Sequence, residues 1–268
     1  MKQIVLILFF VSCVFGSVIK SPVVSVDEHN QTLSIKIDKV DVGMSGFVYK
    51  LLNEKHGSII KSVVVRSFNP DTNIAQLEMS EYKLLKNDAL PKGKWSVEVG
   101  DSVILAFGYT RAMLIAPSEE IYHRITKSAS NLQWIHPDIF ATTLSYTGHP
   151  TPLRSDFTNI CDTTSIGIVF IYLDQNLFTL DCKSFGLLNI TEAPLKQTSV
   201  ELPFYTRLQE IEANWWGEGS DVLHEYEPHY YELMIEANKH NKKLYDIVKN
   251  NDANVSVLLD NFEIGEEK

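Results

Sequence analysis

The sequence predicts an α+β protein in which a small β-barrel or sandwich-like half packs on an α/β half, followed by C-terminal helices. Three observations favour this fold class. Short β-type runs fill residues 18–116, helix-type patterns around one long apolar run fill 117–198, and acidic helix-type sequence fills 199–268. Strands grouped apart from helices are typical of α+β proteins. Apolar residues make up 44% of the chain, which is enough for one large or two small cores.

Residues 1–17, MKQIVLILFFVSCVFGS, predict a secretory signal peptide. One basic residue, Lys2, precedes an uncharged apolar run and then small residues, which is the order that signal peptides share. The run is shorter than the roughly 20 residues of a membrane span, so we expect no transmembrane span after cleavage at Gly16. We therefore expect an exported protein in the periplasm or on the outer cell surface. A less favoured interpretation makes Cys13 the acylated first residue of a lipoprotein.

The β-rich half should contain short strands, because runs rich in β-branched and aromatic residues alternate there with turn signals. The expected strands are 33–37, 46–52, 58–67, 74–79, 102–107 and 112–115. Strands at this spacing predict a small barrel or sandwich. Gly43 and Gly46 indicate a bulge or tight bend at the start of the second strand.

The α/β half should begin with a helix at Pro117, where proline suits the first turn and the acids that follow suit the helix dipole. Further helices are expected at 137–146 and 154–161. The uninterrupted apolar run 165–173 has strand length and predicts a strand buried on both faces, with 177–181 as its partner.

The C-terminal segment carries most of the net charge of −10. From Glu201 onward there are 15 acids and 6 bases, a balance of −9, against 19 acids and 18 bases before it. Such a segment repels nucleic acid and anionic lipid, so we expect no nucleic-acid partner. The pattern predicts helices over 203–216 and 228–250.

Export makes a disulfide between cysteines the expected state, because disulfides persist in oxidising compartments. Once Cys13 is removed with the signal peptide, Cys161 and Cys182 remain as an even pair, and we expect them to be bonded. The alternative is two separate buried thiols. Neither cysteine has a histidine nearby in sequence, which argues against zinc.

Chemistry is suggested most directly by His136-Pro137-Asp138, where a histidine and a carboxylate flank a proline. A catalytic dyad is one interpretation. The favoured one is a structural corner, in which Trp134 packs ahead of a helix, Pro137 occupies its first turn and Asp138 faces the unpaired N–H groups.

Other chemical motifs are weak. In HEYEPH, His224 and His229 are five residues apart, whereas zinc proteases space the two histidines four apart, so we expect no metal site. The chain has no GxGxxG, P-loop or GxSxG pattern, and we expect no cofactor and no enzyme activity. The alternative function is a periplasmic hydrolase or small-ligand-binding protein that uses a cleft between the two halves.

Several segments, in order and spacing, resemble the N-terminal domain of the plasminogen-binding surface proteins of epsilonproteobacteria, the PgbA-type family. The matching stretches are VGMSGFVYKL (42–51), LPKGKWSVEVGDSVIL (90–105), RAMLIAPSEEIY (111–122), WIHPDIFATTL (134–144) and CDTTSIGIVFIYLDQNLFTLDCKSFGLL (161–188). The resemblance implies an exported, non-catalytic envelope protein that binds host plasminogen. In the family that activity is attributed to a lysine-rich tail ending in lysine, so Lys268 is the expected partner-binding residue. This chain departs from the pattern, because the segment before Lys268 is acidic.

Overall fold

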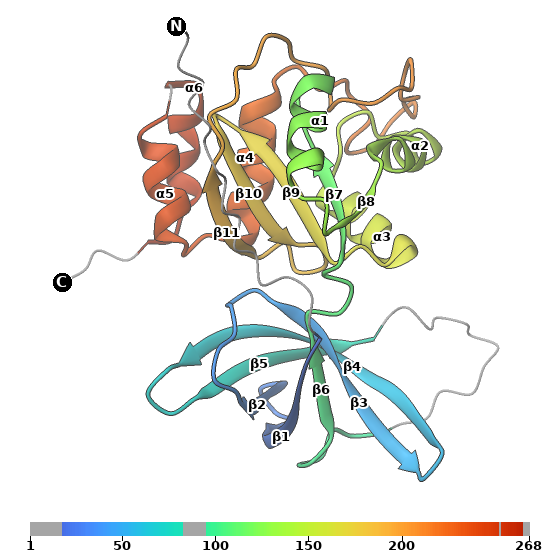
Figure 1. The fold of residues 1–268 in the computed structure, drawn as a ribbon, viewed down its shortest axis with the longest axis vertical. Helices are drawn as coiled ribbons and strands as arrows, with labels where there is room; N and C mark the ends of the chain where they lie inside the picture. The colour runs from blue at the N-terminus through green and yellow to red at the C-terminus, as the bar shows by residue number, and fades with distance from the viewer. Residues whose placement is uncertain (1–17, 83–94, 252, 265–268) are drawn as a thin grey trace, which may run out of the picture.

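The computed structural model describes residues 18–82, 95–251 and 253–264, which form two lobes (Figure 1). The expected signal peptide and Lys268 lie outside the described residues. The first lobe is a closed antiparallel barrel with the strand order β1-β2-β5-β4-β3-β6. Its strands are β1 (Ile19–Asp27), β2 (Thr32–Lys36), β3 (Ser45–Asn53), β4 (His56–Asn69), β5 (Ile74–Glu81) and β6 (Ser102–Leu105).

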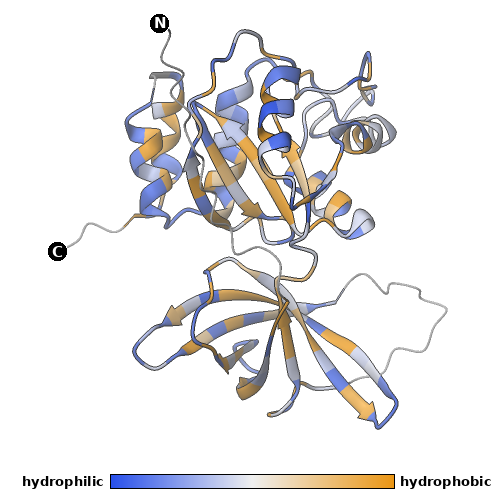
Figure 2. Cartoon of the chain, viewed as in Figure 1, coloured by the Kyte–Doolittle hydropathy of each residue, from blue (hydrophilic) through white to orange (hydrophobic). Residues whose placement is uncertain are grey.

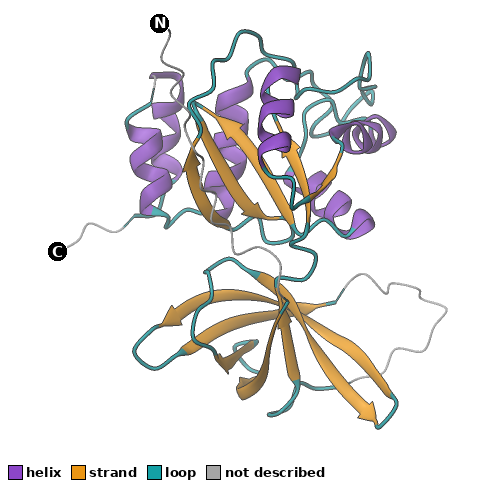
Figure 3. Ribbon diagram, viewed as in Figure 1, coloured by secondary structure: helices purple, strands orange, loops and turns teal. Residues whose placement is uncertain are grey.

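The second lobe is a mixed sheet with the order β11-β10-β9-β7-β8, covered by helices on both faces (Figure 3). β7 pairs in parallel with β8 and β9, and β10 is antiparallel to both β9 and β11. The strands are β7 (Arg111–Ile115), β8 (Gln133–Ile135), β9 (Ile168–Leu173), β10 (Asn176–Asp181) and β11 (Leu187–Glu192). The helices are α1 (Glu119–Ser128), α2 (Pro137–Thr147), α3 (Arg154–Thr164), α4 (Tyr226–Ala237), α5 (Lys242–Lys249), α6 (Ala253–Ser256) and the 3₁₀ turn η1 (Val257–Asn261).

Two apolar cores lie on opposite faces of this sheet. Leu114 of β7 points to the face covered by Ile121 of α1, and this core is continuous with the barrel interior. Ile115, the next residue, points to the face covered by Phe140 of α2 and by α3 and α4. Every residue of β9 is buried, because helices cover both faces, and the central strands are correspondingly apolar in Figure 2.

The two lobes meet in a close backbone contact. A Cβ atom on Gly186, which precedes β11, would lie 2.6 Å from the Cα of Gly43 at the barrel. The Ser184 hydroxyl donates a hydrogen bond to the Gly43 carbonyl at 2.5 Å. Gly43 has φ +92°, a conformation that glycine adopts without strain. Small residues therefore let the sheet and the barrel approach at this point.

The α+β fold class is confirmed, but several expectations about its parts change. The strand expected at 112–115 is β7, which pairs with the second sheet and not with the barrel. The helix predicted over 203–216 is wrong, because this segment is irregular and bonds to the backbone just after β7: the Tyr205 N–H donates to the Ala116 carbonyl at 2.8 Å. The predicted strands also omit β1, β8 and β11.

The long helix predicted over 228–250 is two helices, α4 and α5, because asparagines interrupt it. Asn238 ends α4, and its side chain hydrogen-bonds to Leu187 and Phe185 of the neighbouring chain segment. The side chain of Asn241 then accepts the Leu244 N–H and caps the start of α5. Asparagine competes for backbone groups in this way, so an apolar pattern that continues through it does not ensure one helix.

Candidate functional site

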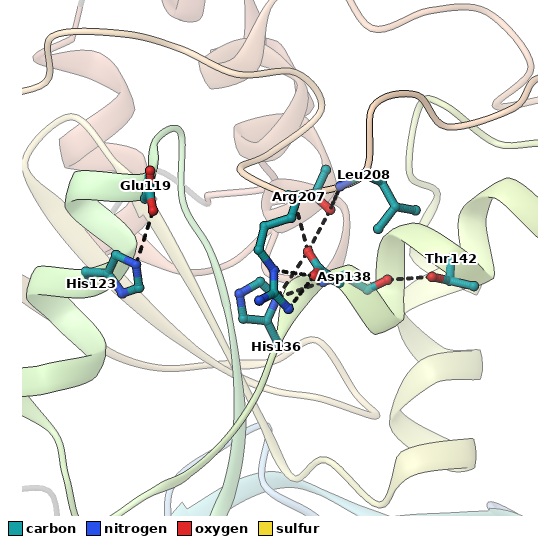
Figure 4. A network of polar contacts seen from close by, with 8 residues as sticks. Glu119, His123, His136, Asp138, Thr142, Arg207 and Leu208 are labelled. Atoms are coloured by element: carbon teal, nitrogen blue, oxygen red, sulfur yellow. Dashed lines mark hydrogen bonds and ion pairs between the residues drawn. The ribbon is translucent and has the colours of Figure 1, made fainter.

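The carboxyl ends of β7 and β8 form the position, here called the crevice, where the sheet topology would place a ligand. These neighbouring strands are parallel, and the chain leaves β7 for α1 on one face and β8 for α2 on the other. In open α/β sheets, ligands bind where adjacent connections diverge in this way. The polar residues found there are His136, Asp138 and Arg207 (Figure 4).

His136 is the N-cap of α2. Its Nδ1 accepts a hydrogen bond from the Asp138 backbone N–H at 3.2 Å, and Pro137 follows as the first helical residue. A side-chain acceptor at this position satisfies a backbone N–H that the helix leaves unpaired. The same nitrogen lies 3.1 Å from the Asp138 carboxylate, so a protonated ring would donate there instead.

The sequence predicted that Asp138 faces the unpaired N–H groups at the start of α2. In the structure its carboxylate instead binds the segment that crosses the crevice. Its Oδ1 accepts the Thr206 hydroxyl and the Arg207 backbone N–H, both at 2.9 Å. Its Oδ2 accepts the Nε–H of the Arg207 guanidinium at 2.6 Å, and Nη2 of the same guanidinium forms an ion pair with this oxygen at 2.6 Å. The three hydrogen bonds and the ion pair all come from residues almost 70 positions later in the chain, so the carboxylate fixes tertiary structure.

The electrostatics of the pair follow from these contacts. Burial lowers the pKa of His136 below its ordinary value, and the nearby Arg207 charge acts in the same direction, while Asp138 opposes both. Burial alone would raise the pKa of Asp138, but the hydrogen bonds from Arg207 and Thr206 together outweigh it and leave the pKa lowered. The structure therefore favours a neutral histidine beside an ionised aspartate.

Aromatic rings enclose the His136 side chain. Its ring centroid lies 5.1 Å from that of Tyr122 on α1 and 6.1 Å from that of Tyr205. Tyr205 belongs to the segment that crosses the crevice, and the Glu201 N–H in the same segment donates to the Pro117 carbonyl at 2.7 Å. Residues 201–208 therefore occupy the place where a ligand of an open α/β sheet would lie.

The structure also places the other residues singled out in the sequence. Cys161 on α3 and Cys182 after β10 form a disulfide, with Cα atoms 5.7 Å apart. Trp134 on β8 packs against Phe170, with ring centroids 5.4 Å apart, and its indole N–H donates to the Ala129 carbonyl at 3.0 Å. Each pair therefore links two different parts of the second lobe.

The histidines of HEYEPH are not brought together at a metal. His224 is exposed, and the Nε2 of His229 lies 3.0 Å from the Pro152 carbonyl. Within residues 18–82, 95–251 and 253–264, no group of three His, Cys, Asp or Glu side chains is arranged to hold a metal ion.

Among the helices described, none combines the length and apolar character needed to cross a bilayer.

Two hollows lie beside the β9–β10 turn, and both are lined by the second lobe alone. The larger, of about 770 Å³, is bordered by Tyr172 and residues 194–200, and the smaller, of about 470 Å³, by the start of α4 and by α6. They share Asp174, Val200 and Glu227. The Tyr226 hydroxyl, at the smaller hollow, is buried without a hydrogen-bond partner among the described residues.

Sequence reasoning missed Tyr122, Tyr205 and Arg207. Arg207 did leave a signal, because it is the only lysine or arginine between Lys196 and Lys239. A single cation in a long acidic stretch is a candidate for a structural ion pair with a distant carboxylate. The two tyrosines carried no such signal, because their spacing fits an ordinary apolar helix face.

Together the fold and this crevice define a two-lobed α+β protein, a barrel docked on a mixed sheet, whose strand-end crevice is filled by its own chain. The chain belongs to the family described as plasminogen-binding protein pgbA N-terminal, whose sequence model matches residues 18–234. This match confirms the family resemblance expected from the sequence.

Two curated relatives are similar to the chain. It is 26% identical over 218 residues to the plasminogen-binding protein PgbA of Helicobacter pylori strain J99 / ATCC 700824, and to that of strain ATCC 700392 / 26695. The match covers 80% of this chain but 47% and 46% of those proteins, so the chain spans about half the length of these curated relatives. No solved structure matches the chain.

Proposed function

We propose that this chain is an exported protein of the bacterial cell envelope that binds host plasminogen and catalyses no reaction. The observation that carries the non-catalytic part is the use of Asp138. A catalytic carboxylate must orient a base or meet a substrate, whereas Asp138 already accepts three hydrogen bonds from Thr206 and Arg207 and forms an ion pair with the Arg207 guanidinium. His136, the other half of the dyad, serves as a helix cap.

Export is supported by the apolar leader over 1–17 and by the Cys161–Cys182 disulfide, since disulfides persist outside the cytoplasm. Plasminogen as the partner is supported by the names of the relatives and by the family. Those relatives are about twice as long as this chain, so the matched region is only part of each relative. The periplasm and the outer surface remain the two proposed locations, and acylation at Cys13 is the less favoured anchor.

Surface plasmon resonance tests the proposal. The chain from residue 18 to Lys268 is passed over immobilised plasminogen, with and without 6-aminohexanoic acid, a free lysine analogue. We expect saturable binding that the analogue abolishes. A version ending at Glu267 tests Lys268, whose ammonium and terminal carboxylate would both pair with fixed charges in the partner. No binding by either version overturns the proposal, and equal binding by both removes Lys268 from it.

The second candidate function is small-ligand binding or hydrolysis, in the hollows beside the β9–β10 turn and not between the lobes. The buried, unpartnered Tyr226 hydroxyl favours it, because an unmade hydrogen bond in a buried site is costly unless a ligand makes it. Thermal-shift screening with small polar compounds tests this candidate. A stabilising compound that loses its effect in Tyr226→Phe would support it, and no stabilising compound would dismiss it.

A further inference from the structure

Two adjacent tryptophans are almost fully exposed on the second lobe. Trp215 is 96% exposed and Trp216 is 82% exposed, whereas tryptophan is a largely buried residue in most proteins. Both lie in residues 212–222, here called the tryptophan loop. The loop begins after the buried Ile211 and ends before the buried Leu223. Exposed apolar groups of this size are typical of interaction sites.

The backbone of the tryptophan loop is held in place by the turn between α2 and α3. Asn214 donates through its backbone N–H to the Gly148 carbonyl at 3.0 Å and through its side chain to the Thr147 carbonyl at 2.6 Å. On the other side of the tryptophans, Thr151 donates to the carbonyls of Gly219 and Asp221. The rings are thus carried on an anchored support.

Glycines shape the tip of the loop. Gly217 and Gly219 have φ values of +118° and +82°, in the region that favours glycine. A Cβ atom on Gly219 would lie 2.9 Å from the Thr151 carbonyl oxygen. A loop whose backbone is already anchored loses little backbone entropy when a partner binds, and tryptophan is enriched among the strongest contacts of interfaces.

The charge around the rings selects the partner. From Leu208 to Glu227 the chain has six acids and no lysine or arginine. Glu212 and Glu218, on either side of the tryptophans, are exposed, as are Glu210 and Asp221. Tryptophan is the best aromatic partner for a cation, and a ring beside carboxylates attracts ammonium and guanidinium groups while it repels anionic lipid.

We propose that the tryptophan loop is a docking surface for a lysine- or arginine-rich stretch of another polypeptide. Side-chain cations of the partner stack on Trp215 and Trp216, and the neighbouring carboxylates pair with further cations along the stretch. A polypeptide fits better than a single amine, because the acids extend along the chain on both sides of the rings. This surface goes beyond plasminogen binding through Lys268 and does not depend on it.

Fluorescence anisotropy with labelled peptides tests the inference. The probes are octalysine, octaglutamate and a glycine–serine octapeptide, each titrated with the chain from residue 18 to Lys268. We expect octalysine alone to bind, and Trp215→Ala/Trp216→Ala to weaken it about tenfold. Because this variant keeps the net charge of the protein, it separates the loop from general attraction to an acidic surface. Leu51→Ala, which removes an apolar side chain 63% exposed on the barrel, should leave octalysine binding unchanged.

A second variant, Glu212→Gln/Glu218→Gln, should also weaken octalysine and reduce the dependence of its affinity on salt. Melting temperatures within the error of the parent show that the variants fold. Equal octalysine affinity for the parent and the tryptophan variant overturns the inference, as does the absence of octalysine binding. Tighter binding of an unlabelled chito-oligosaccharide than of octalysine, measured by calorimetry and lost in the tryptophan variant, also overturns it and assigns the loop to a neutral glycan.

Discussion

The carboxylate of Asp181, at the end of β10, accepts both the backbone N–H and the hydroxyl of Ser45, at the start of β3, at 2.9 and 2.7 Å. The Tyr109 hydroxyl, on the connection between the lobes, donates to the same oxygen at 2.7 Å. The other oxygen accepts the N–H groups of Lys183 and Ser184. Asp181 is 0% exposed. One buried carboxylate therefore joins the barrel, the connection and the sheet.

We expect Asp181→Asn to lower the free energy of unfolding by about 3 kcal/mol, because an amide cannot accept all five donors and leaves buried N–H and O–H groups unpaired. Ser45→Ala removes one hydroxyl and should cost about 1 kcal/mol. Urea unfolding followed by circular dichroism measures both. Asp162→Asn, which breaks a partly exposed pair with Lys183, is the control and should cost less than about 1 kcal/mol. An Asp181 variant as stable as the control would show that Asp181 is not what holds the lobes.

Gly186→Ala should destabilise the protein by about 2 kcal/mol or more, because the added Cβ would meet the Gly43 Cα at 2.6 Å and backbone atoms on both sides must shift. Gly100→Ala is the matched control. Gly100 has φ +96° and open space around its Cβ position, so the variant carries backbone strain without a clash. Thermal unfolding ranks the two. A smaller loss for Gly186→Ala than for Gly100→Ala would contradict the tight contact between the lobes.

Local patterns predicted the barrel strands β2 to β6, because each of these strands has a buried face, and missed β1. In β5 the buried residues Ala75, Leu77 and Met79 alternate with exposed ones, and this alternation is visible in the sequence. The start of α2 was also predicted from the sequence, because proline is favoured at the first position of a helix and Pro137 occupies it. Periodicity and turn chemistry act over a few residues, and there they were sufficient.

Long-range contacts set the features that the sequence did not reveal. Residues 203–216 have apolar positions that fit a helix, yet Phe204 and Tyr205 are buried by an irregular segment tied to Asp138. β8 has only three residues, too few for any period, and exists because β7 is beside it. Contacts between residues about 70 positions apart form only in the packed fold. Local patterns in the sequence therefore could not predict the crevice.

Removal of the Cys161–Cys182 disulfide should lower stability by roughly 3 kcal/mol, since the bond closes a loop across 21 positions in the unfolded chain. Mass spectrometry of the non-reduced exported protein should find no free thiol at either position. Urea unfolding with and without dithiothreitol measures the loss, and Cys161→Ala/Cys182→Ala should be indifferent to the reductant. Two free thiols in the exported protein would rule out the bond.

His136 should make stability fall as the pH drops below about 6.5, its ordinary pKa. Because the pKa of folded His136 is lowered, the unfolded chain takes up the proton first, so the stabilisation is complete above pH 6.5 and is lost as the pH falls through the folded pKa. His136→Asn keeps an N-cap acceptor and should flatten this part of the profile. His229, whose pKa is lowered by burial, leaves a residual slope. An unchanged slope in the variant would show that the ring titrates freely.

Asp138→Ala should release residues 201–208 from the end of α2, because it removes the acceptor of Thr206 and of both the backbone and the guanidinium of Arg207. Hydrogen exchange should then speed up at the amides of residues 201–208, and most at Arg207, whose own N–H is bonded to the carboxylate. Arg207→Ala leaves the Thr206 and backbone bonds in place and should have a smaller effect.

Arg124→Ala is the matched control for that experiment, since Arg124 is 61% exposed against 66% for Arg207 and pairs with Glu120 along α1. A pair within one helix does not hold distant segments together, so exchange at residues 201–208 should stay at the parent rate. The expected order of exchange rates is Asp138→Ala fastest, then Arg207→Ala, then Arg124→Ala equal to the parent. If Asp138→Ala matches Arg124→Ala, the crevice is closed by the apolar contacts of Phe204 and Tyr205, and the carboxylate is free for another role.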